Sequence, residues 1–235
     1  MASGVAWRED NDADGRSEVY RLGMAMVSGR PGAVLDLMGK LPRAHPQGAV
    51  FNYSTGESCL LGAVVVAATG RLMADYFAEK IWGPAGMEAD GHWHLESEDG
   101  LELGGLGVSL RLRDAARFGQ LILEDGRAFN GRQVLPPGWR DLASRPDSAA
   151  TAFGRLRPGD PGGDGYQWWV TPPAPGVHDG VFAALGAYGQ FIYINPADQV
   201  VIAIQSAWRQ SEDTEARLAT VPLIRAAVSA LRQAS

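Results

Sequence analysis

The sequence predicts an α+β fold, with a helical lobe first along the chain and an antiparallel sheet with a C-terminal helix last. Two observations support this order. In the first part of the chain the apolar residues recur every three or four positions, which is the period of an amphipathic helix. After Gly165 the apolar residues fall into short runs separated by turn residues, which is typical of strands.

The composition is that of a globular domain. The chain has 235 residues, 46% of them apolar, which is enough for a real core. We expect a single domain over residues 1–235, with residues 1–145 forming mainly the helical lobe and residues 146–235 the sheet and last helix. The formal net charge of −6 argues against a nucleic-acid partner, because phosphate binding requires a basic face. No run of about 18 apolar residues is present, so no membrane span is expected.

The helices expected in the first lobe are bounded by residues that start or stop a helix. Residues 1–18 are rich in Asp, Asn and Gly and are expected to form a loop. Gly70 follows an apolar stripe and is a typical helix end, and Asp125-Gly126 stops a later helix. Gly83-Pro84-Ala85-Gly86 is expected to break the helix before it. The predicted helices are residues 19–29, 33–41, 56–69, 71–81 and 112–124.

The expected sheet follows a long loop at residues 144–165, which is rich in Pro, Gly, Asp and Ser. Pro196-Ala197-Asp198 is a tight turn, so the last two strands are expected to pair as an antiparallel hairpin. A long amphipathic helix at residues 212–233 ends the chain, and Pro222 is expected to kink it. The predicted strands are residues 165–171, 180–188, 190–195 and 199–207.

Five short blocks follow one another in order along the chain: Phe51-Asn52-Tyr53-Ser54-Thr55, Gly104-Gly105-Leu106-Gly107-Val108-Ser109, Arg113-Asp114-Ala115-Ala116-Arg117-Phe118-Gly119, Tyr166-Gln167-Trp168-Trp169 and Gly186-Ala187-Tyr188-Gly189-Gln190. Together they resemble the class C β-lactamase and penicillin-binding-protein-like family of serine hydrolases, over nearly the whole chain. The last two blocks are most similar to the 6-aminohexanoate-dimer hydrolase and esterase branch. The resemblance implies a β-lactamase/transpeptidase-like fold and hydrolysis of amides or esters.

The family that these blocks resemble works through an acyl-enzyme, in which a serine attacks the carbonyl and a lysine one helical turn later helps to accept its proton. The chain has two lysines, and the residues three positions before them are Leu37 and Phe77, so the Ser-x-x-Lys motif is absent. Met1-Ala2-Ser3-Gly4-Val5 resembles a family segment that lies downstream of the nucleophile. We therefore expect the domain to be incomplete at its N-terminus, and this chain to be inactive alone.

Tyr53 is the candidate catalytic residue. The resemblance implies that it lies beside the nucleophile and acts as a general acid and base toward the leaving group. A phenol has a pKa near 10 in water, so this role needs a neighbouring cation, which in the family is the lysine. The alternative is a buried tyrosine with a satisfied hydroxyl. Thr55, a candidate substrate-binding residue, stands where many relatives have Asn, and a hydroxyl makes fewer hydrogen bonds than an amide.

The block that contains Tyr188 stands where the family has a strand that binds the substrate carboxylate through a cation and completes the oxyanion hole. Tyr188 replaces the cation, which favours neutral amides or esters over β-lactams and peptide carboxylates. The candidate substrate-binding residues here are Tyr188, Gly189, Gln190 and Trp168. The alternatives are an ordinary strand aromatic for Tyr188 and a core side chain for Trp168.

Two further patterns allow other chemistry. His92 and His94 would lie on one face of a strand and could hold a metal ion, but no third ligand follows in a recognisable pattern. We therefore expect an exposed strand there, and neither a metal ion nor another cofactor. Ser58 stands in a block that starts like a nucleophile elbow but lacks the closing glycine, so a helical serine is expected.

The predicted function is a β-lactamase-related serine hydrolase of amide or ester bonds in small molecules. The alternative is a non-catalytic remnant or a module that binds a ligand or partner. The apolar strand that runs from Gln199 to Ser206 would be an open sheet edge, so self-association through it is predicted. Met1 to Asp10 does not resemble a signal peptide, which favours the cytoplasm, while a missing upstream part would leave the localisation unknown.

Overall fold

The computed structural model describes residues 1–10, 15–158, 160–172 and 180–234, so residues 11–14 and 159 of the expected loops lie outside the described residues. The chain forms two compact units. Unit 1 comprises Met1–Gly83, Ala89–Leu110 and Ser148–Thr151, and unit 2 comprises Pro84–Glu88, Arg111–Asp147 and Ala152–Ser235. Residues 111–145, which were expected with the helical lobe, are therefore grouped with the sheet. The single domain stays a prediction.

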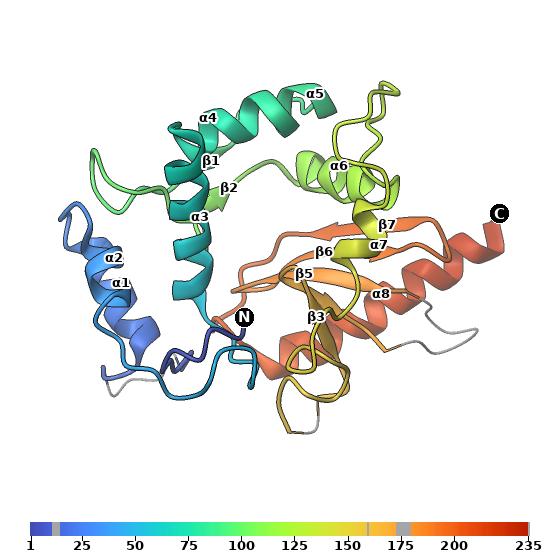
Figure 1. The fold of residues 1–235 in the computed structure, drawn as a ribbon. Helices are drawn as coiled ribbons and strands as arrows, with labels where there is room; N and C mark the ends of the chain where they lie inside the picture. Colours follow the sequence, from blue (N-terminus) through green and yellow to red (C-terminus); the bar gives the residue numbers. More distant parts are fainter. Residues whose placement is uncertain (11–14, 159, 173–179, 235) are drawn as a thin grey trace. The chain divides into compact units, whose positions relative to one another are not determined.

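Unit 1 is mainly helical (Figure 1). Short strands β1 and β2 pair antiparallel, His92 with Ser109 and Trp93 with Val108. The predicted ends of the first three helices agree to within three residues, and Gly70 ends the helix Thr55–Thr69 in the left-handed conformation, with φ 67°. The elements are α1 Glu18–Val27, α2 Ala33–Met38, α3 Thr55–Thr69, α4 Met73–Phe77, η1 Ala78–Trp82, β1 His92–Trp93 and β2 Val108–Ser109.

The predicted break at Gly83-Pro84-Ala85-Gly86 comes only at its last residue, because the helix runs on to Ala85 and Gly86 then has a left-handed φ of 75°. The π-helical η1 continues directly into α5, Gly83–Ala85, and Gly83 has helical dihedral angles of φ −63° and ψ −51°. A proline ring at Pro84 would clash with the carbonyl one turn earlier in a regular α-helix. The wider π-helical turn displaces that carbonyl, so the chain passes the proline without leaving the helix.

The core of unit 1 lies between the short helices and α3. Its buried apolar residues are Trp7, Leu22, Val34, Met38, Cys59 and Leu103. The paired glycines Gly104 and Gly105 pass against the first turns of α3, where a Cβ on Gly104 would lie 2.7 Å from the Ser58 carbonyl oxygen. The Gly-Gly block of the sequence is therefore required by a close approach of backbone to backbone.

Two buried glutamates cap helices that have no local cap. Glu96 is 2% exposed and accepts hydrogen bonds from the N–H groups of Gly32, at 2.6 Å, and Val34, at 3.0 Å. Glu102 does the same at the start of α4, where it accepts from the Met73 and Ala74 N–H groups. A carboxylate at a helix N-terminus satisfies unpaired N–H groups and interacts favourably with the helix dipole.

Unit 2 contains a five-stranded antiparallel sheet in the order β3-β4-β5-β6-β7. Helix α6 packs on one face of the sheet and α8 lies along the other (Figure 1). The expected α+β fold is thus confirmed. The elements are α6 Leu112–Leu123, α7 Trp139–Ala143, β3 Gly163–Gly165, β4 Trp168–Val170, β5 Phe182–Gly186, β6 Gln190–Asn195, β7 Val200–Ile204 and α8 Thr214–Ala234.

The prediction of one strand over residues 165–171 is wrong, because these residues include the turn of a hairpin. β3 pairs with β4 through Gly163 with Val170 and Gly165 with Trp168, and the turn is Tyr166-Gln167. Neither residue is a typical turn former, so the pattern could not reveal the turn. The expected loop over residues 144–165 correspondingly ends in β3.

Helices α6 and α8 are attached to the sheet by different contacts. Gly119 of α6 lies so close to the sheet that a Cβ there would stand 2.6 Å from Val201 Cγ1. α8 runs through Pro222 as one helix and is tied to the β6–β7 turn by Arg232, whose guanidinium binds Asp198 with two contacts of 2.6 Å. β7 ends the strand order of the described residues, with β6 as its partner. Self-association through this edge stays a prediction.

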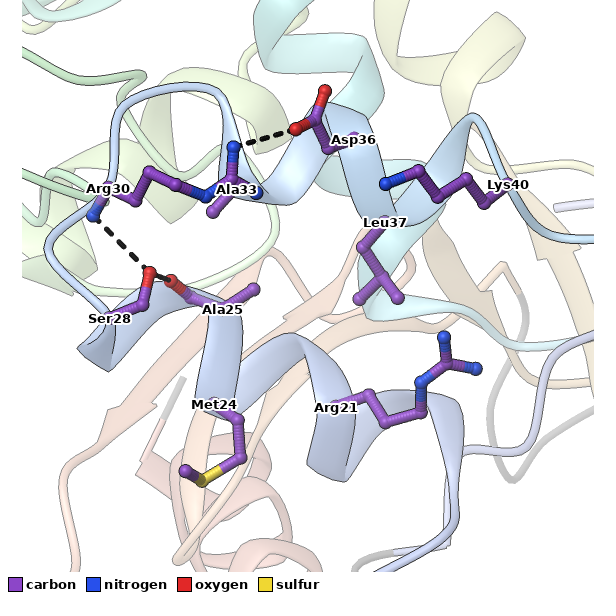
Figure 2. A pocket seen from close by; sticks show the side chains of 9 residues that line it. All are labelled: Arg21, Met24, Ala25, Ser28, Arg30, Ala33, Asp36, Leu37 and Lys40. Carbon is purple, nitrogen blue, oxygen red and sulfur yellow. Dashed lines mark hydrogen bonds and ion pairs between the residues drawn. The ribbon is translucent and has the colours of Figure 1, made fainter.

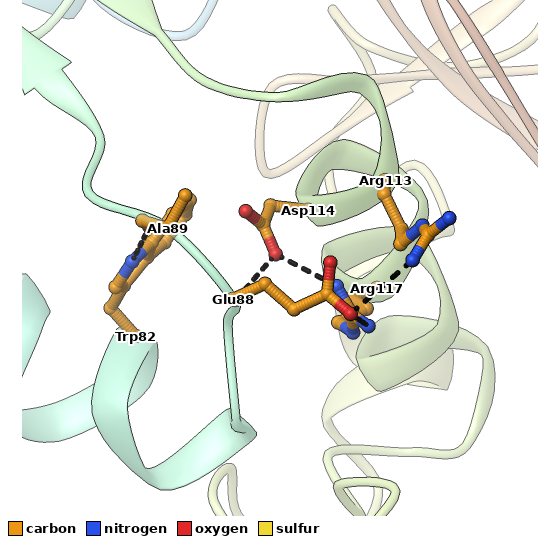
Figure 3. A network of polar contacts seen from close by, with 6 residues as sticks. All are labelled: Trp82, Glu88, Ala89, Arg113, Asp114 and Arg117. Atoms are coloured by element: carbon orange, nitrogen blue, oxygen red, sulfur yellow. Dashed lines mark hydrogen bonds and ion pairs between the residues drawn. The ribbon is translucent and has the colours of Figure 1, made fainter.

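The Arg-Asp block of the sequence has a structural role in unit 2 (Figure 3). Asp114 is fully buried and accepts a hydrogen bond from the Glu88 N–H, at 2.8 Å, and from Arg117 Nη1, at 3.0 Å. Arg117 also pairs with the Glu88 carboxylate, which Arg113 approaches at 3.5 Å. The block therefore anchors residues 84–88 on α6.

Among the described residues no single helix is long and apolar enough to span a membrane. By length and composition alone, α3 and Met73–Ala85 together would be long and apolar enough, as a pair bent by 76°.

Candidate functional site

Tyr53 lies directly before α3, in a segment that is held on both sides. The Asn52 N–H donates to the Met1 carbonyl oxygen at 3.0 Å, and the Ser54 N–H lies 3.1 Å from Met1 Sδ. The Asn52 side chain donates to the Trp7 carbonyl oxygen at 2.9 Å. Tyr53 itself is half-buried. Its backbone is therefore fixed by the first residues of the chain.

Glu9 holds Thr55, two residues after Tyr53, through hydrogen bonds. Its carboxylate accepts from Trp7 Nε1 at 2.5 Å, from the Thr55 N–H at 2.9 Å and from the Thr55 hydroxyl. Because the single hydroxyl proton of Thr55 goes to Glu9, this side chain can offer a ligand only its acceptor lone pairs. Substrate binding by Thr55 stays a prediction, limited by this geometry to ligands that donate.

Ser54 and Ser58 both have structural surroundings. Ser54 is fully buried, and its hydroxyl accepts from the Glu57 N–H at 3.1 Å, which makes it the N-cap of α3. Ser58 is buried within α3, as expected for a helical serine. The adjacent Cys59 is buried, and burial raises the pKa of its thiol, which disfavours the nucleophilic thiolate.

The second group of predicted residues lies in unit 2, at the turn between β5 and β6. Tyr188 has a left-handed backbone, φ 59°, and is 51% exposed. Its N–H donates to the Ser211 carbonyl oxygen at 3.0 Å, and its carbonyl accepts from the Trp208 N–H at 3.2 Å. The Tyr188 N–H is thus already used inside the protein and is not a free oxyanion donor.

Gly189 and Gln190 hold the same turn against the segment that follows β7. Gly189 has φ 84°, and a Cβ there would lie within 2.7 Å of Trp208 ring atoms, so only glycine fits. Gln190 Nε2 donates to the Ser206 carbonyl oxygen at 2.7 Å. Trp208 packs on Phe191 at a ring distance of 5.7 Å. The two predicted residues therefore support the position of Tyr188.

Trp168 lies in the core of unit 2. Its ring stacks on Phe118 at 6.5 Å and meets Phe182 edge-on at 5.2 Å. Both contacts belong to the apolar cluster between α6 and the sheet. The geometry thus favours the core alternative for Trp168, while a part in substrate binding remains a prediction.

A cavity of about 400 Å³ lies elsewhere in unit 1, between α1 and α2 (Figure 2). Arg21, Arg30 and Lys40 line it together with Asp36, and Arg30 pairs with Asp36 at 2.7 Å. None of the predicted site residues lines it. Lys80, the other lysine of the chain, pairs with Glu79 at 2.6 Å.

The histidine pair has no metal-binding surroundings in the part of the chain that the structure describes. His92 belongs to the two-residue β1. His94 lies just after this strand, and its backbone N–H donates to the Gly107 carbonyl oxygen at 3.1 Å. Among the described residues no group of three His, Cys, Asp or Glu side chains is placed to hold a metal ion.

Comparison with known proteins agrees with this fold and with the order of the blocks. The family described as Beta-lactamase matches residues 1–226. The chain belongs to the beta-lactamase family. The resemblance inferred from the sequence blocks is thereby confirmed at the level of the family.

Three known proteins are similar to the chain in sequence or in structure. The 6-aminohexanoate-dimer hydrolase of Paenarthrobacter ureafaciens is 28% identical over 160 residues, which cover 67% of this chain and 39% of that protein. A presumed 6-aminohexanoate-dimer hydrolase from Bacillus anthracis has a TM-score of 0.81 and 25% identity, over 98% of this chain and 59% of that one. EstCE1, a hydrolase with promiscuous acyltransferase activity, has a TM-score of 0.68 and 20% identity, over 97% and 69%.

The chain thus spans about 59% of the Bacillus anthracis protein. Within the beta-lactamase family it is similar, at low identity, to 6-aminohexanoate-dimer hydrolase.

Two residues that hold predicted residues in place, one in each unit, are not among those predicted from the sequence. Glu9 reaches Thr55 across 46 positions of the chain, and Trp208 covers Gly189. Neither belongs to one of the five blocks, and contacts between distant positions leave no periodic signal in a single sequence. The glycine at position 189 was the only local sign that something approaches closely there.

Proposed function

We propose that this chain carries substrate-recognition and proton-transfer residues of a hydrolase of amide or ester bonds, and that it forms no acyl-enzyme alone. The observation that supports the proposal is the fixed position of Tyr53, held through its neighbours by Met1 and Glu9. General acid catalysis requires the donor to be held within hydrogen-bond reach of the leaving group. A tyrosine in a fixed segment meets this requirement better than one on a free loop.

The missing step is nucleophilic attack. No serine stands three residues before Lys40 or Lys80, and Lys80 is engaged by Glu79. Without an activated serine no group attacks the substrate carbonyl carbon, so the bond to the leaving group does not break and no acyl-enzyme forms. Only a nucleophile from outside these 235 residues would allow Tyr53 to protonate the departing amine or alcohol.

The substrate class is a neutral amide or ester. The block around Tyr188 offers an aromatic ring and not a cation, so a substrate carboxylate gains nothing there. A short linear amide fits this proposal, and the name of the Paenarthrobacter relative supports cleavage of an amide bond.

Intact mass spectrometry tests the absence of the nucleophile. The purified chain is incubated with p-nitrophenyl hexanoate, and we expect its mass to stay unchanged, with no burst of p-nitrophenol. A family hydrolase that carries Ser-x-x-Lys serves as the positive control. One hexanoyl group per chain, mapped to a serine, would overturn the proposal.

Titration with an uncharged linear amide, N-butylhexanamide, tests the role of Tyr53. Tyr53→Phe removes one hydroxyl and should weaken binding about five-fold, the equivalent of about 1 kcal/mol for a hydrogen bond. Tyr76→Phe is the matched control, because Tyr76 is not one of the predicted site residues. Tyr76 lies on α4, and its ring contacts the side chains of Arg71 and Lys80. Equal affinities of the two variants would count against Tyr53 as a substrate contact.

A non-catalytic binding module is the second candidate, and the absence of Ser-x-x-Lys favours it. The DNA upstream of Met1 distinguishes the two. An in-frame Ser-x-x-Lys there supports a hydrolase, whereas stop codons support a binding module.

A further inference from the structure

The cavity between α1 and α2 is lined by one face of each helix (Figure 2). Its volume of about 400 Å³ lies within the range of sites that hold small molecules. The α1 residues that line it follow the helical spacing i, i+3, i+4, i+7: Arg21, Met24, Ala25 and Ser28. The same spacing recurs in α2 and the turn that follows it: Ala33, Asp36, Leu37 and Lys40. Two helical faces are therefore directed at one space.

The floor of this cavity is apolar. Ala25 and Ala33, one on each helix, leave room that a larger side chain would fill. Leu37 packs against the core of unit 1 with one side, and the Met24 side chain next to the cavity is 52% exposed. An apolar surface of this kind gains free energy when an alkyl chain covers it.

The charge around the floor is positive, in a chain whose net charge is −6. Arg30 Nη1 pairs with the Asp36 carboxylate at 2.7 Å, and this guanidinium holds the pKa of Asp36 below its usual value, so the two charges compensate each other. Ser28 donates its hydroxyl proton to the Ala25 carbonyl oxygen at 2.6 Å, which satisfies a carbonyl of the last turn of α1.

Arg21 and Lys40 remain as cations that can bind a ligand. Figure 2 shows both side chains extending toward Leu37, one from α1 and one from beyond the end of α2. Arg21 approaches Glu18 only at 3.9 Å, and the other oxygen of Glu18 accepts from the Arg8 N–H at 2.9 Å. Within the described residues Lys40 forms no ion pair. A guanidinium and an ammonium that face one cavity match a carboxylate, which accepts hydrogen bonds at both oxygens.

We propose that the cavity between α1 and α2 is a binding site for a short-chain alkyl carboxylate. The carboxylate group lies between Arg21 and Lys40. The alkyl chain covers Met24, Ala25 and Leu37. The site shares no residue with those given to the reaction, so it goes beyond the proposed function and does not depend on it.

Methyl NMR of methionine tests where the carboxylate binds. The chain has six methionines, and in protein labelled with carbon-13 in the methionine methyl groups the Met24 signal is assigned by Met24→Leu. Titration with octanoate should shift the Met24 signal along a saturable curve and leave that of Met73, at the start of α4, unchanged. From butanoate through hexanoate to octanoate, each added methylene should tighten binding about two- to four-fold. An unshifted Met24 signal, or an affinity independent of chain length, would overturn the proposal.

Two comparison ligands separate the charged and the apolar parts of recognition. The alcohol 1-octanol keeps the chain without the charge, and inorganic phosphate keeps negative charge without the chain. Both should bind at least about ten-fold more weakly than octanoate. If 1-octanol binds as tightly, the cations have no part in binding, and if phosphate binds as tightly, the apolar floor has none. Either result overturns the proposal.

Removal of a charge tests the carboxylate contact. Lys40→Gln should weaken octanoate binding about five-fold, the loss of one exposed charged contact. Lys80→Gln is the matched control, because Lys80 is the other lysine of the chain, pairs with Glu79 and does not line the cavity. Equal affinities of these two variants would overturn the proposal.

Filling the cavity tests the place of the alkyl chain. Ala25→Leu should abolish the Met24 shift with octanoate without lowering the melting temperature, because the added side chain occupies the apolar floor. Ala67→Leu adds the same side chain at an exposed position of α3 and should leave octanoate binding unchanged. Unchanged binding in folded Ala25→Leu protein would overturn the proposal, and if this variant does not fold, Lys40→Gln decides.

Discussion

Asp164 of β3 should make the stability of the protein depend on pH. The residue is 5% exposed, and burial raises the pKa of its carboxyl from 3.8 to about 6, with the charge of Asp147 adding to the rise. A carboxyl with a raised pKa in the folded state is penalised when it is charged. Its contribution to stability is therefore fully present below about pH 4 and is lost as the pH rises through about 6.

The size of the effect follows from the shift. The difference between about 6 and 3.8 is about 2.2 units, and at 1.36 kcal/mol per unit it corresponds to about 3 kcal/mol, as an upper limit. Asp164→Asn remains uncharged at every pH. The stability of this variant relative to the wild type should therefore increase by up to about 3 kcal/mol between pH 4 and pH 7, and then level off.

Urea unfolding of both proteins at one-unit pH steps measures this difference, because the other titrating groups cancel. Asp198→Asn is a control of opposite sign, since Arg232 lowers the pKa of Asp198 and its stabilisation is lost as the pH falls. A difference between Asp164→Asn and wild type that stays constant within about 0.5 kcal/mol over this range would refute the argument.

Two further predictions concern the contacts that hold the candidate site. Gly189→Ala should cost at least about 2 kcal/mol in urea unfolding, because φ is 84° and a Cβ meets Trp208. Gly180→Ala also has a positive φ, 68°, but open space around the Cβ, and should cost about 1 kcal/mol. Equal costs would exclude the clash. Glu9→Gln should cost about 1–3 kcal/mol and weaken binding of N-butylhexanamide, because an amide cannot accept all three bonds from Trp7 and Thr55. Faster hydrogen exchange at the start of α3 would be the structural sign, and its absence would contradict the role given to Glu9.

Local signals predicted the parts of the fold that depend on neighbours in the chain. The helix over residues 56–69 begins one residue earlier, at Thr55, and ends at Gly70 in the left-handed conformation. The hairpin around Pro196-Ala197-Asp198 was predictable because its turn residues are typical ones, and β6 has the predicted bounds, Gln190–Asn195. In the same way, the residues around Tyr53 could be recognised because the block is continuous in sequence.

The errors arise where tertiary contacts override local preference. The β3–β4 turn uses Tyr166 and Gln167, which local preference places in a strand, and the cost is met by the pairing of the surrounding sheet. The helix that continues through Gly83 does so by a π-helical turn that no residue pattern signals.

The sequence by itself determined the family, the order of helices and strands, and the absence of Ser-x-x-Lys, because each of these is written in adjacent residues. Only the tertiary structure decided that the Thr55 hydroxyl belongs to Glu9, that Trp168 is packed in a core, and that Gly189 lies under Trp208. The physical reason is that hydrogen bonds and ring contacts depend on distance in space. Folding brings together side chains that are far apart in the chain, and a single sequence does not record which of them meet.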